Sequence, residues 1–349
     1  MMIKKISIVL SILITIIILS CKDQKKEKQS IPEKQIPREL AELNQRILEN
    51  PNNPDYYQAR AEYYLNTKEF NSAMNDISTA LKIDSSNSNY YVTLSTIFLA
   101  TGNIGKCKKV LEESISLDPE NDEAYLKLAE LYFYKRDYKQ SLEHINKSIE
   151  INSQNHNVYF LRAFISKESG DTAAAIEDIN KAVTISPDFY EGYLWLGILH
   201  AYQKNDLAVD YYNNALDVRP NSIEAYYNLA MYYQGKEEFN KSIELYTTIL
   251  KIDPKYKYAH YNLGYIHYEY LKIYDMAARY FTDAINDDPN YVEAYYGRGI
   301  SYKSMGDVMR ARQDFLKALE IKPNYENALA ELNRLDEEER IIRKEQNAY

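Results

Sequence analysis

Few side chains in this chain of 349 residues could do chemistry, since it has five histidines and two cysteines. His260 and His267 come nearest to a metal site, because residues seven apart share one face of a helix. Two turns separate them by about 10 Å, too far for one metal ion without a third ligand between them. We therefore expect both to be hydrogen-bonded core histidines. A metal-binding or pH-sensing role is the alternative.

Motifs of catalysis are absent from the sequence. It has no glycine loop for phosphate, no paired-cysteine metal pattern and no Gly-x-Ser-x-Gly elbow. Cys107 lies among small residues and is expected to pack as a hydrophobic side chain. The sequence therefore predicts a protein that is not an enzyme and that needs no cofactor and no metal.

The charge of the chain bears on its partners. Its 42 basic and 51 acidic residues give a formal net charge of −9. Nucleic-acid binding wants a basic stripe, so we expect no nucleic-acid partner. The balance suits solubility and a basic protein partner.

The elements that hold these side chains repeat with a period of about 34 residues. A proline, or a serine in its place, recurs at Pro51, Ser85, Pro119, Ser153, Pro187, Pro220, Pro254, Pro289 and Pro323. Such a rhythm indicates an array of one supersecondary unit, not a single globular core.

Other columns keep the same period. An aromatic column holds Tyr57, Tyr91, Tyr125, Tyr159, Tyr193, Tyr226, His260 and Tyr295. The first small column, four residues later, holds Ala61, Ser95, Ala129, Ala163, Gly197, Ala230, Gly264 and Gly299. The second small column holds Ala73, Cys107, Ser141, Ala175, Ala208, Ser242, Ala277 and Ala311. A third column, seven residues further on, is again mostly small.

Each repeat reads as a helical hairpin. Tyr226, Ala230 and Tyr233 have the i, i+4, i+7 spacing of one helix face. Gly102 and Gly170 break the pattern halfway through their repeats, as turns do. We call the first helix of a repeat helix A and the second helix B. Proline or serine then ends helix B, and small residues let the two helices approach closely.

These columns resemble the tetratricopeptide repeat, with close matches in "YYNLAMYY" at 226–233, "HYNLGYIHY" at 260–268 and "YLWLGILH" at 193–200. The resemblance implies an all-α fold, an α-solenoid forming a right-handed superhelix of about eight stacked helix-turn-helix repeats over 54–323. The expected repeats are 54–87, 88–121, 122–155, 156–189, 190–222, 223–256, 257–291 and 292–325. An N-terminal half-repeat helix at 38–50 and a capping helix and tail at 326–349 should flank them, with Leu329, Leu332 and Leu335 on the apolar side of the cap.

Three features depart from the pattern. Repeat 5 lacks one residue around 203–206, and repeat 7 has one extra near 270–275; both changes should fall between helix A and helix B. Three repeats carry arginine where the pattern prefers leucine, at Arg60, Arg162 and Arg298. We expect their stems to pack and their charged heads to lie at the surface.

In the family that these repeats resemble, helix A lines a concave face that binds peptides or helices. The resemblance implies a protein or peptide ligand and a groove lined by Phe133, Phe160, Trp195, Tyr202, Tyr227, Asn228, Tyr261, Asn262, Tyr265, Tyr268 and Tyr296. Tyrosine and tryptophan are favoured at interfaces because one end is apolar and the other forms hydrogen bonds. The alternative is that some of these rings only pack between neighbouring helices A.

The N-terminus carries a targeting signal. Lys4 and Lys5 precede an apolar run, and this run is short enough for a secretory signal. "ILSC" at 18–21 resembles the lipobox of bacterial lipoproteins, which implies a signal peptide at 1–20 and a lipid on Cys21. Residues 21–37 are polar and should form a disordered tether. An uncleaved signal anchor is the alternative.

Together these features predict a non-enzymatic, membrane-anchored scaffold of a bacterial cell envelope. The outer membrane is favoured over the inner, and the face is left open. Two rivals remain: a structural subunit of an envelope assembly or secretion complex, and an accessory protein that binds glycan or peptidoglycan.

Overall fold

A computed structural model describes residues 37–346, and all regular secondary structure within that range is helical. The predicted signal peptide, the tether with Cys21 and the last three residues lie outside the described residues. The chain divides into two compact units, one reaching Ile83 and the other starting at Asp84. In the first unit, α2 (Arg38–Glu49) precedes the helix pair α3 (Pro54–Asn66) and α4 (Phe70–Ile83).

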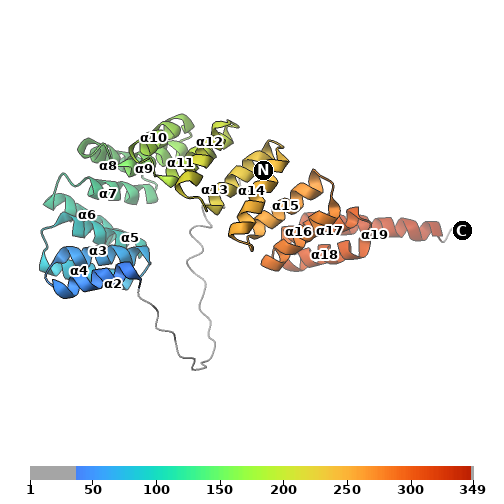
Figure 1. The fold of residues 1–349 in the computed structure, drawn as a ribbon, viewed down its shortest axis with the longest axis horizontal. Coiled ribbons are helices and arrows are strands. Elements are labelled where there is room, and N and C mark those ends of the chain that lie inside the picture. The colour runs from blue at the N-terminus through green and yellow to red at the C-terminus, as the bar shows by residue number, and fades with distance from the viewer. Residues whose placement is uncertain (1–36, 347–349) are drawn as a thin grey trace, which may run out of the picture. The chain divides into compact units, whose positions relative to one another are not determined.

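The second unit continues as consecutive helix pairs (Figure 1). Their helices A are α5 (Ser88–Ala100), α7 (Asp122–Tyr134), α9 (His156–Glu168), α11 (Tyr190–Tyr202), α13 (Ile223–Gly235), α15 (Lys257–Glu269) and α17 (Val292–Ser304). Their helices B are α6 (Ile104–Leu117), α8 (Tyr138–Ile151), α10 (Thr172–Ile185), α12 (Leu207–Val218), α14 (Phe239–Ile252), α16 (Tyr274–Asp287) and α18 (Val308–Ile321). This arrangement confirms the predicted all-α class of paired helices.

The turn between helix A and helix B has a fixed conformation. In every pair one turn residue has a positive φ, at Lys68, Gly102, Arg136, Gly170, Lys204, Glu237, Lys272 and Gly306. The extra residue of repeat 7 lies between the end of α15 at Glu269 and this left-handed residue, Lys272. The missing residue of repeat 5 lies just after Lys204, where α12 begins late, at Leu207. Both irregularities therefore fall in the predicted turns.

The aromatic column follows the recurring proline or serine by six residues, and a hydrogen bond explains this spacing. In three repeats the tyrosine hydroxyl donates to the backbone carbonyl of the proline or serine. These bonds are Tyr57 to Pro51 (3.0 Å), Tyr91 to Ser85 (3.1 Å) and Tyr159 to Ser153 (3.2 Å). Each bond fixes the start of helix A against the segment that precedes it.

Within each pair, the first small column of helix A faces the residue four positions after the second small column on helix B. We call this facing position the filler column. Its residues are Ile77, Leu111, Ile145, Ile179, Tyr212, Tyr246, Phe281 and Phe315, all buried. Three of its four rings lie opposite glycine. A Cβ on Gly197 would lie 2.5 Å from the Tyr212 ring, and one on Gly264 would lie 2.9 Å from the Phe281 ring.

The arginines that replace leucine do not place their heads at the surface, so that prediction was wrong. Each guanidinium forms a bidentate ion pair with an aspartate sixteen residues later, on helix B of the same repeat. The pairs are Arg60–Asp76 (2.7 Å), Arg162–Asp178 (2.6 Å) and Arg298–Asp314 (2.7 Å). Repeats with leucine at the first position hold Val110, His144, Tyr211, Leu245 or Tyr280 at the second. Arginine and aspartate therefore occur only together.

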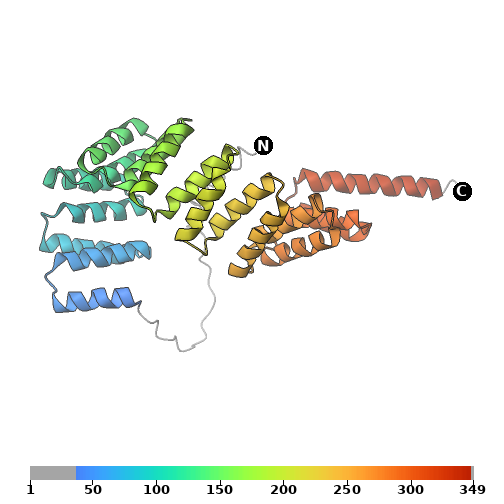
Figure 2. The same cartoon turned by 45° about the horizontal axis from the view of Figure 1, so that its top comes forward.

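The last helix, α19 (Glu326–Gln346), packs on α18 and continues past it (Figure 2). Leu332 and Leu335 are buried as predicted, but Leu329 is 49% exposed and does not belong to the packed side. Among the described helices, none combines the length and the apolar character that a membrane span requires.

The contact between Gly197 and the Tyr212 ring predicts how much stability is lost when a methyl group is added at Gly197. Gly197→Ala should destabilise the protein by about 1–3 kcal/mol, because the Tyr212 ring is buried and has no room to move. Gly235→Ala is the matched control, since nothing lies within 4 Å of its added Cβ. Urea unfolding followed by circular dichroism measures both changes. Equal stability of the two variants would contradict the contact.

The ion pairs predict a compensating double substitution. Arg162→Leu should cost about 2–4 kcal/mol, because it leaves the buried Asp178 without its partner. Adding Asp178→Leu should recover most of this loss, since repeat 6 holds Leu229 and Leu245 at the equivalent positions. Thermal unfolding of the two single variants and the double variant gives the coupling. Additive losses would show that the pair does not act as a unit.

Candidate protein-binding face

Three helices A of the second unit carry a continuous ladder of aromatic rings. Phe133 on α7 lies 6.4 Å from Phe164 on α9, which lies 4.9 Å from Trp195 on α11. Phe160 meets Phe164 edge to face at 4.9 Å. All four side chains are half-buried. We call these four residues the aromatic ladder; it presents ring surface to solvent while its members pack on one another.

A positive charge lies at one end of the ladder. The Nζ atom of Lys167 is 5.5 Å from the centre of the Trp195 ring, within the range of a cation–π interaction. Tyr202, at the end of α11, is 67% exposed and projects beyond the packed rings. Trp195 is also the single tryptophan of the chain, which makes it a fluorescent reporter for this face.

The next helices A carry tyrosines in place of phenylalanine. Tyr227 of α13 lies 6.0 Å from Tyr256, and Tyr261 of α15 lies 5.1 Å from Tyr291. Burial raises the pKa of Tyr256 to about 12 and also raises the pKa of Tyr261. These hydroxyls therefore stay neutral at physiological pH and can donate hydrogen bonds. Tyr296 of α17 packs against Phe315 at 5.9 Å.

The two predicted amides have internal hydrogen bonds. Asn262 is buried, and its Nδ2 donates to the hydroxyl of Tyr227 at 3.2 Å. Asn228 is half-buried and donates to the carbonyl of Glu224 at 2.8 Å. Each amide thus keeps its own donor occupied in this structure.

The remaining predicted groove residues pack near the turn of repeat 7. Tyr265 lies edge to face with Tyr270 at 5.9 Å, and Tyr268 lies 5.6 Å from Tyr274. Both are half-buried. Among the predicted groove residues Tyr202 is thus largely exposed, the other rings are half-buried, and Asn262 is internal. Their contact with a ligand stays a prediction.

His260, His267 and Cys107 each have a structural role in the packed array. His260 Nδ1 lies 2.7 Å from Asp287 Oδ2, and His267 Nδ1 lies 2.7 Å from the Leu263 carbonyl. Both are therefore satisfied core histidines, as predicted. Cys107 is 1% exposed, and burial raises its pKa to about 11, so the thiol is neutral and inert. Residues 37–346 contain no group of three acidic, histidine or cysteine side chains placed to hold a metal.

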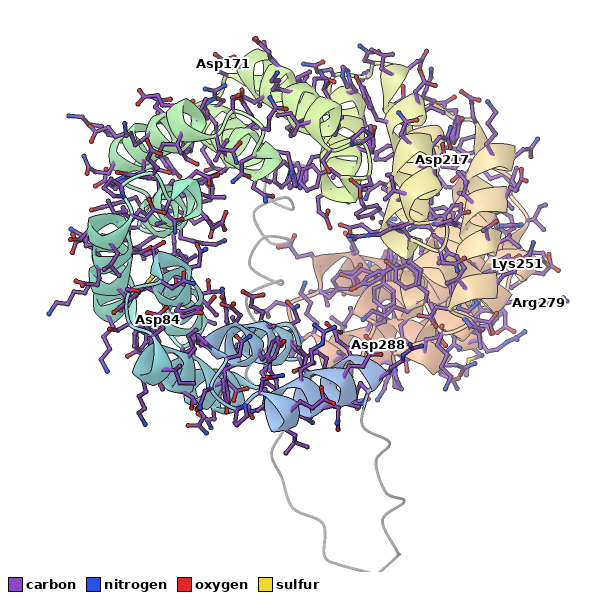
Figure 3. All side chains as sticks on the ribbon, turned by 60° about the vertical axis from the view of Figure 1, so that its left-hand side comes forward. Asp84, Asp171, Asp217, Lys251, Arg279 and Asp288 are labelled. Atoms are coloured by element: carbon purple, nitrogen blue, oxygen red, sulfur yellow. The ribbon has the colours of Figure 1, made fainter. Side chains whose placement is uncertain are left out.

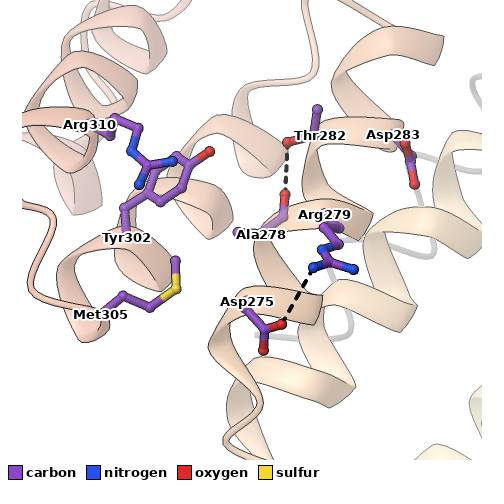
Figure 4. A pocket seen from close by; sticks show the side chains of 8 residues that line it. All are labelled: Asp275, Ala278, Arg279, Thr282, Asp283, Tyr302, Met305 and Arg310. Carbon is purple, nitrogen blue, oxygen red and sulfur yellow. Dashed lines mark hydrogen bonds and ion pairs between the residues drawn. The ribbon is translucent and has the colours of Figure 1, made fainter.

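A cavity of about 400 Å³ lies between α16, α17 and the start of α18 (Figure 4). Its lining includes Tyr302 and Met305 together with charged side chains. Most of these charges are already matched, since Asp275 lies 3.9 Å from Arg279, and Arg310 bonds Asp307 at 2.5 Å while lying over the Tyr302 ring. No sequence pattern predicts this cavity, because its walls come from two neighbouring repeats.

The paired helices and the aromatic face define a helical-repeat scaffold. Profiles of the tetratricopeptide repeat match residues 54–87, 88–121, 122–155, 156–189, 223–256, 258–291 and 292–325. The chain therefore belongs to the tetratricopeptide repeat family. Residues 190–222, which contain the shortened turn, form the pair α11 and α12.

Relatives match only parts of their own length. The general transcriptional corepressor ssn6 of Schizosaccharomyces pombe is 32% identical over 133 residues, which are 37% of this chain and 12% of that protein. Human tetratricopeptide repeat protein 6 is 29% identical over 130 residues, 36% of this chain and 25% of that protein. This chain thus spans a quarter or less of either.

Similarity to solved structures supports the fold. The crystal structure of the APC/C hetero-tetramer Cut9-Hcn1 superposes with a TM-score of 0.52 at 18% identity, covering 85% of this chain and 58% of that one. The repeats and these relatives support a protein–protein interaction scaffold. Repeat scaffolds of this kind are generally non-enzymatic.

Proposed function

We propose that this protein is a lipid-anchored scaffold that binds a segment of another protein along the helices A of its second unit. The observation that carries the proposal is the aromatic ladder of Phe133, Phe160, Phe164 and Trp195. Phe160 and Trp195 each meet Phe164 edge to face, and Phe133 packs on it at a tilt, so their conformations are set before a ligand arrives. Preorganised rings lose little side-chain entropy on binding, which favours affinity.

The chemistry of the face suggests what the segment presents. The ladder offers apolar ring edges, and Lys167 offers a positive charge beside Trp195. Further along, the neutral tyrosines offer hydroxyl groups. A matching segment would carry apolar side chains spaced to meet successive helices A. It would also carry an acidic group near Lys167.

The anchoring half of the proposal rests on sequence features. The basic residues, the short apolar run and Cys21 suit a lipoprotein leader. Several acyl chains on one cysteine would make anchoring effectively stable, whereas one chain gives marginal binding. We place the protein in a bacterial cell envelope, with the outer membrane favoured. The repeats would then hold a partner at the membrane, without catalysis.

Site-specific photo-cross-linking tests the binding face. A photoreactive amino acid at Tyr202 should capture the partner in the native host, because this side chain is exposed beside the ladder. The same amino acid at Asp217 is the matched control, since Asp217 is exposed on helix B of the same repeat (Figure 3). Adducts at 202 and not at 217, identified by mass spectrometry, are expected. Equal adducts at both positions, or none at 202, would contradict the proposal.

Membrane fractionation tests the anchor. Cys21→Ser should move the protein from the membrane fraction to the soluble fraction, because the acyl chains lose their attachment site. Cys107→Ser is the control and should stay with membranes, since its column accepts serine: Ser141 there donates to the Ala129 carbonyl at 2.8 Å. Retention of the Cys21→Ser protein in membranes would instead favour an uncleaved signal anchor.

A further inference from the structure

Six basic side chains gather at one edge of repeats 2 and 3. Successive helices run in opposite directions, so the start of α6, the end of α7 and the start of α8 meet at this edge. We call the six residues the basic edge; they are Lys106, Lys108, Lys109, Lys135, Arg136 and Lys139.

A buried ring ties the two repeats together at this edge. Tyr132 is 9% exposed, and the Nζ atoms of Lys108 and Lys135 lie 5.8 and 5.6 Å from its centre. His144 of α8 stacks on the same ring at 5.3 Å. Lys108 and Lys135 therefore come from different repeats, yet both lie near the Tyr132 ring. Their stems pack and their ammonium groups stay at the surface.

Most of these cations have no carboxylate partner within the described residues. Lys108 pairs with Glu112 at 3.5 Å, whereas the other five form no ion pair there. Cations at the starts of other helices B are neutralised: Lys241 by Glu238 at 2.6 Å and Arg310 by Asp307 at 2.5 Å. The basic edge is thus an exception in a chain whose net charge is −9.

Helix geometry does not explain the cations at three of these places. Lys106 and Lys109 lie in the first turns of α6, and Lys139 lies in the first turn of α8, where the helix dipole is positive. A like charge there is unfavourable for each helix at low ionic strength. Asn103 also offers no side-chain acceptor to the first turn of α6, so the positive end of that helix dipole is uncapped. Both effects add to a local positive potential.

We propose that the basic edge binds an acidic polypeptide segment. The Debye length is about 8 Å at physiological ionic strength, so the acidic remainder of the chain does not cancel this local potential. Exposed Tyr134, next to Lys135, adds a ring that an apolar side chain of the segment can contact. The proposal is independent of ligand binding at the aromatic ladder.

The flanking charges favour a peptide over a membrane surface. The next turn along the array presents exposed Asp171 (Figure 3) and Glu168, and Asp137 follows Arg136 within the edge itself. An anionic bilayer would meet these acidic groups together with the lysines. A narrow acidic segment can follow the lysines alone.

Fluorescence anisotropy of a labelled deca-glutamate peptide tests the proposal on the full-length chain. Wild type should bind the peptide, and binding should weaken steeply between 50 and 200 mM salt. The edge variant carries Lys106→Gln, Lys109→Gln, Lys135→Gln and Lys139→Gln. Its affinity should fall roughly ten-fold or more, since four exposed ion pairs are lost. Arg136 is kept because its φ of 59° would add backbone effects.

A control variant separates the site from net charge. It carries Lys181→Gln, Lys251→Gln, Lys255→Gln and Lys322→Gln, which remove the same charge from exposed positions elsewhere. It should keep wild-type affinity within about two-fold, because these lysines belong to repeats 4, 6 and 8 and the edge belongs to repeats 2 and 3. If the edge variant unfolds, Lys109→Gln alone should still lose about two-fold.

Three results would overturn the proposal. The first is equal loss of affinity in the edge and control variants, which would show attraction by net charge alone. The second is no binding of deca-glutamate to wild type. The third is binding to phosphatidylglycerol vesicles without binding to the peptide, which would assign the edge to a membrane surface.

Discussion

The close approach of the two helices in each pair is the constraint on which the rest of the structure depends. Helix A offers a small residue, and helix B fills the space opposite with a branched or aromatic side chain. Where the filler is the ring of Tyr212, Phe281 or Phe315, helix A has glycine; where it is isoleucine or leucine, helix A has alanine or serine. Ala230 opposite Tyr246 is the exception. Volume is thus conserved across the contact, as close-packed interiors require.

This contact decides which side chains are left for other work. Side chains of the small columns and of the filler column pack between helix A and helix B of one repeat. In three repeats the tyrosine of the aromatic column bonds the segment that precedes helix A. What remains on helix A is the set of positions between the columns. In repeats 3, 4 and 5 these positions hold the rings of the aromatic ladder, which also contact one another across repeats. The same rings therefore serve packing and proposed binding. Because they pack on one another across repeats, their conformations are fixed before a ligand binds.

Much of the fold was predictable because the same residue pattern recurs in eight repeats. A helix or turn that is unclear in one repeat is clear in the others. Paired helices, turn positions, the two length irregularities and the burial of His267 and Cys107 all follow from columns that recur at one spacing. The arginine positions were found but their surroundings were misjudged. The signal was in the sequence: Asp76, Asp178 and Asp314 follow the arginines by sixteen residues and occur at that position in no other repeat.

Other features depend on three-dimensional neighbours that one sequence does not specify. Asn262 looked like a groove amide, yet it is buried because Tyr227 of the preceding repeat offers it a hydroxyl acceptor. Leu329 shares the spacing of Leu332 and Leu335, yet it is 49% exposed. The basic edge was missed because its lysines lie on three different helices.

The central claim is that the helices A of repeats 3 to 5 form the protein-binding face. Trp195, the single tryptophan, lies within that face and permits a direct measurement. A purified partner segment should be titrated against the protein while Trp195 emission is recorded, with calorimetry providing an independent affinity. The account predicts that the emission intensity or maximum changes and saturates at the calorimetric affinity. Saturable binding by calorimetry with unchanged Trp195 emission would contradict it.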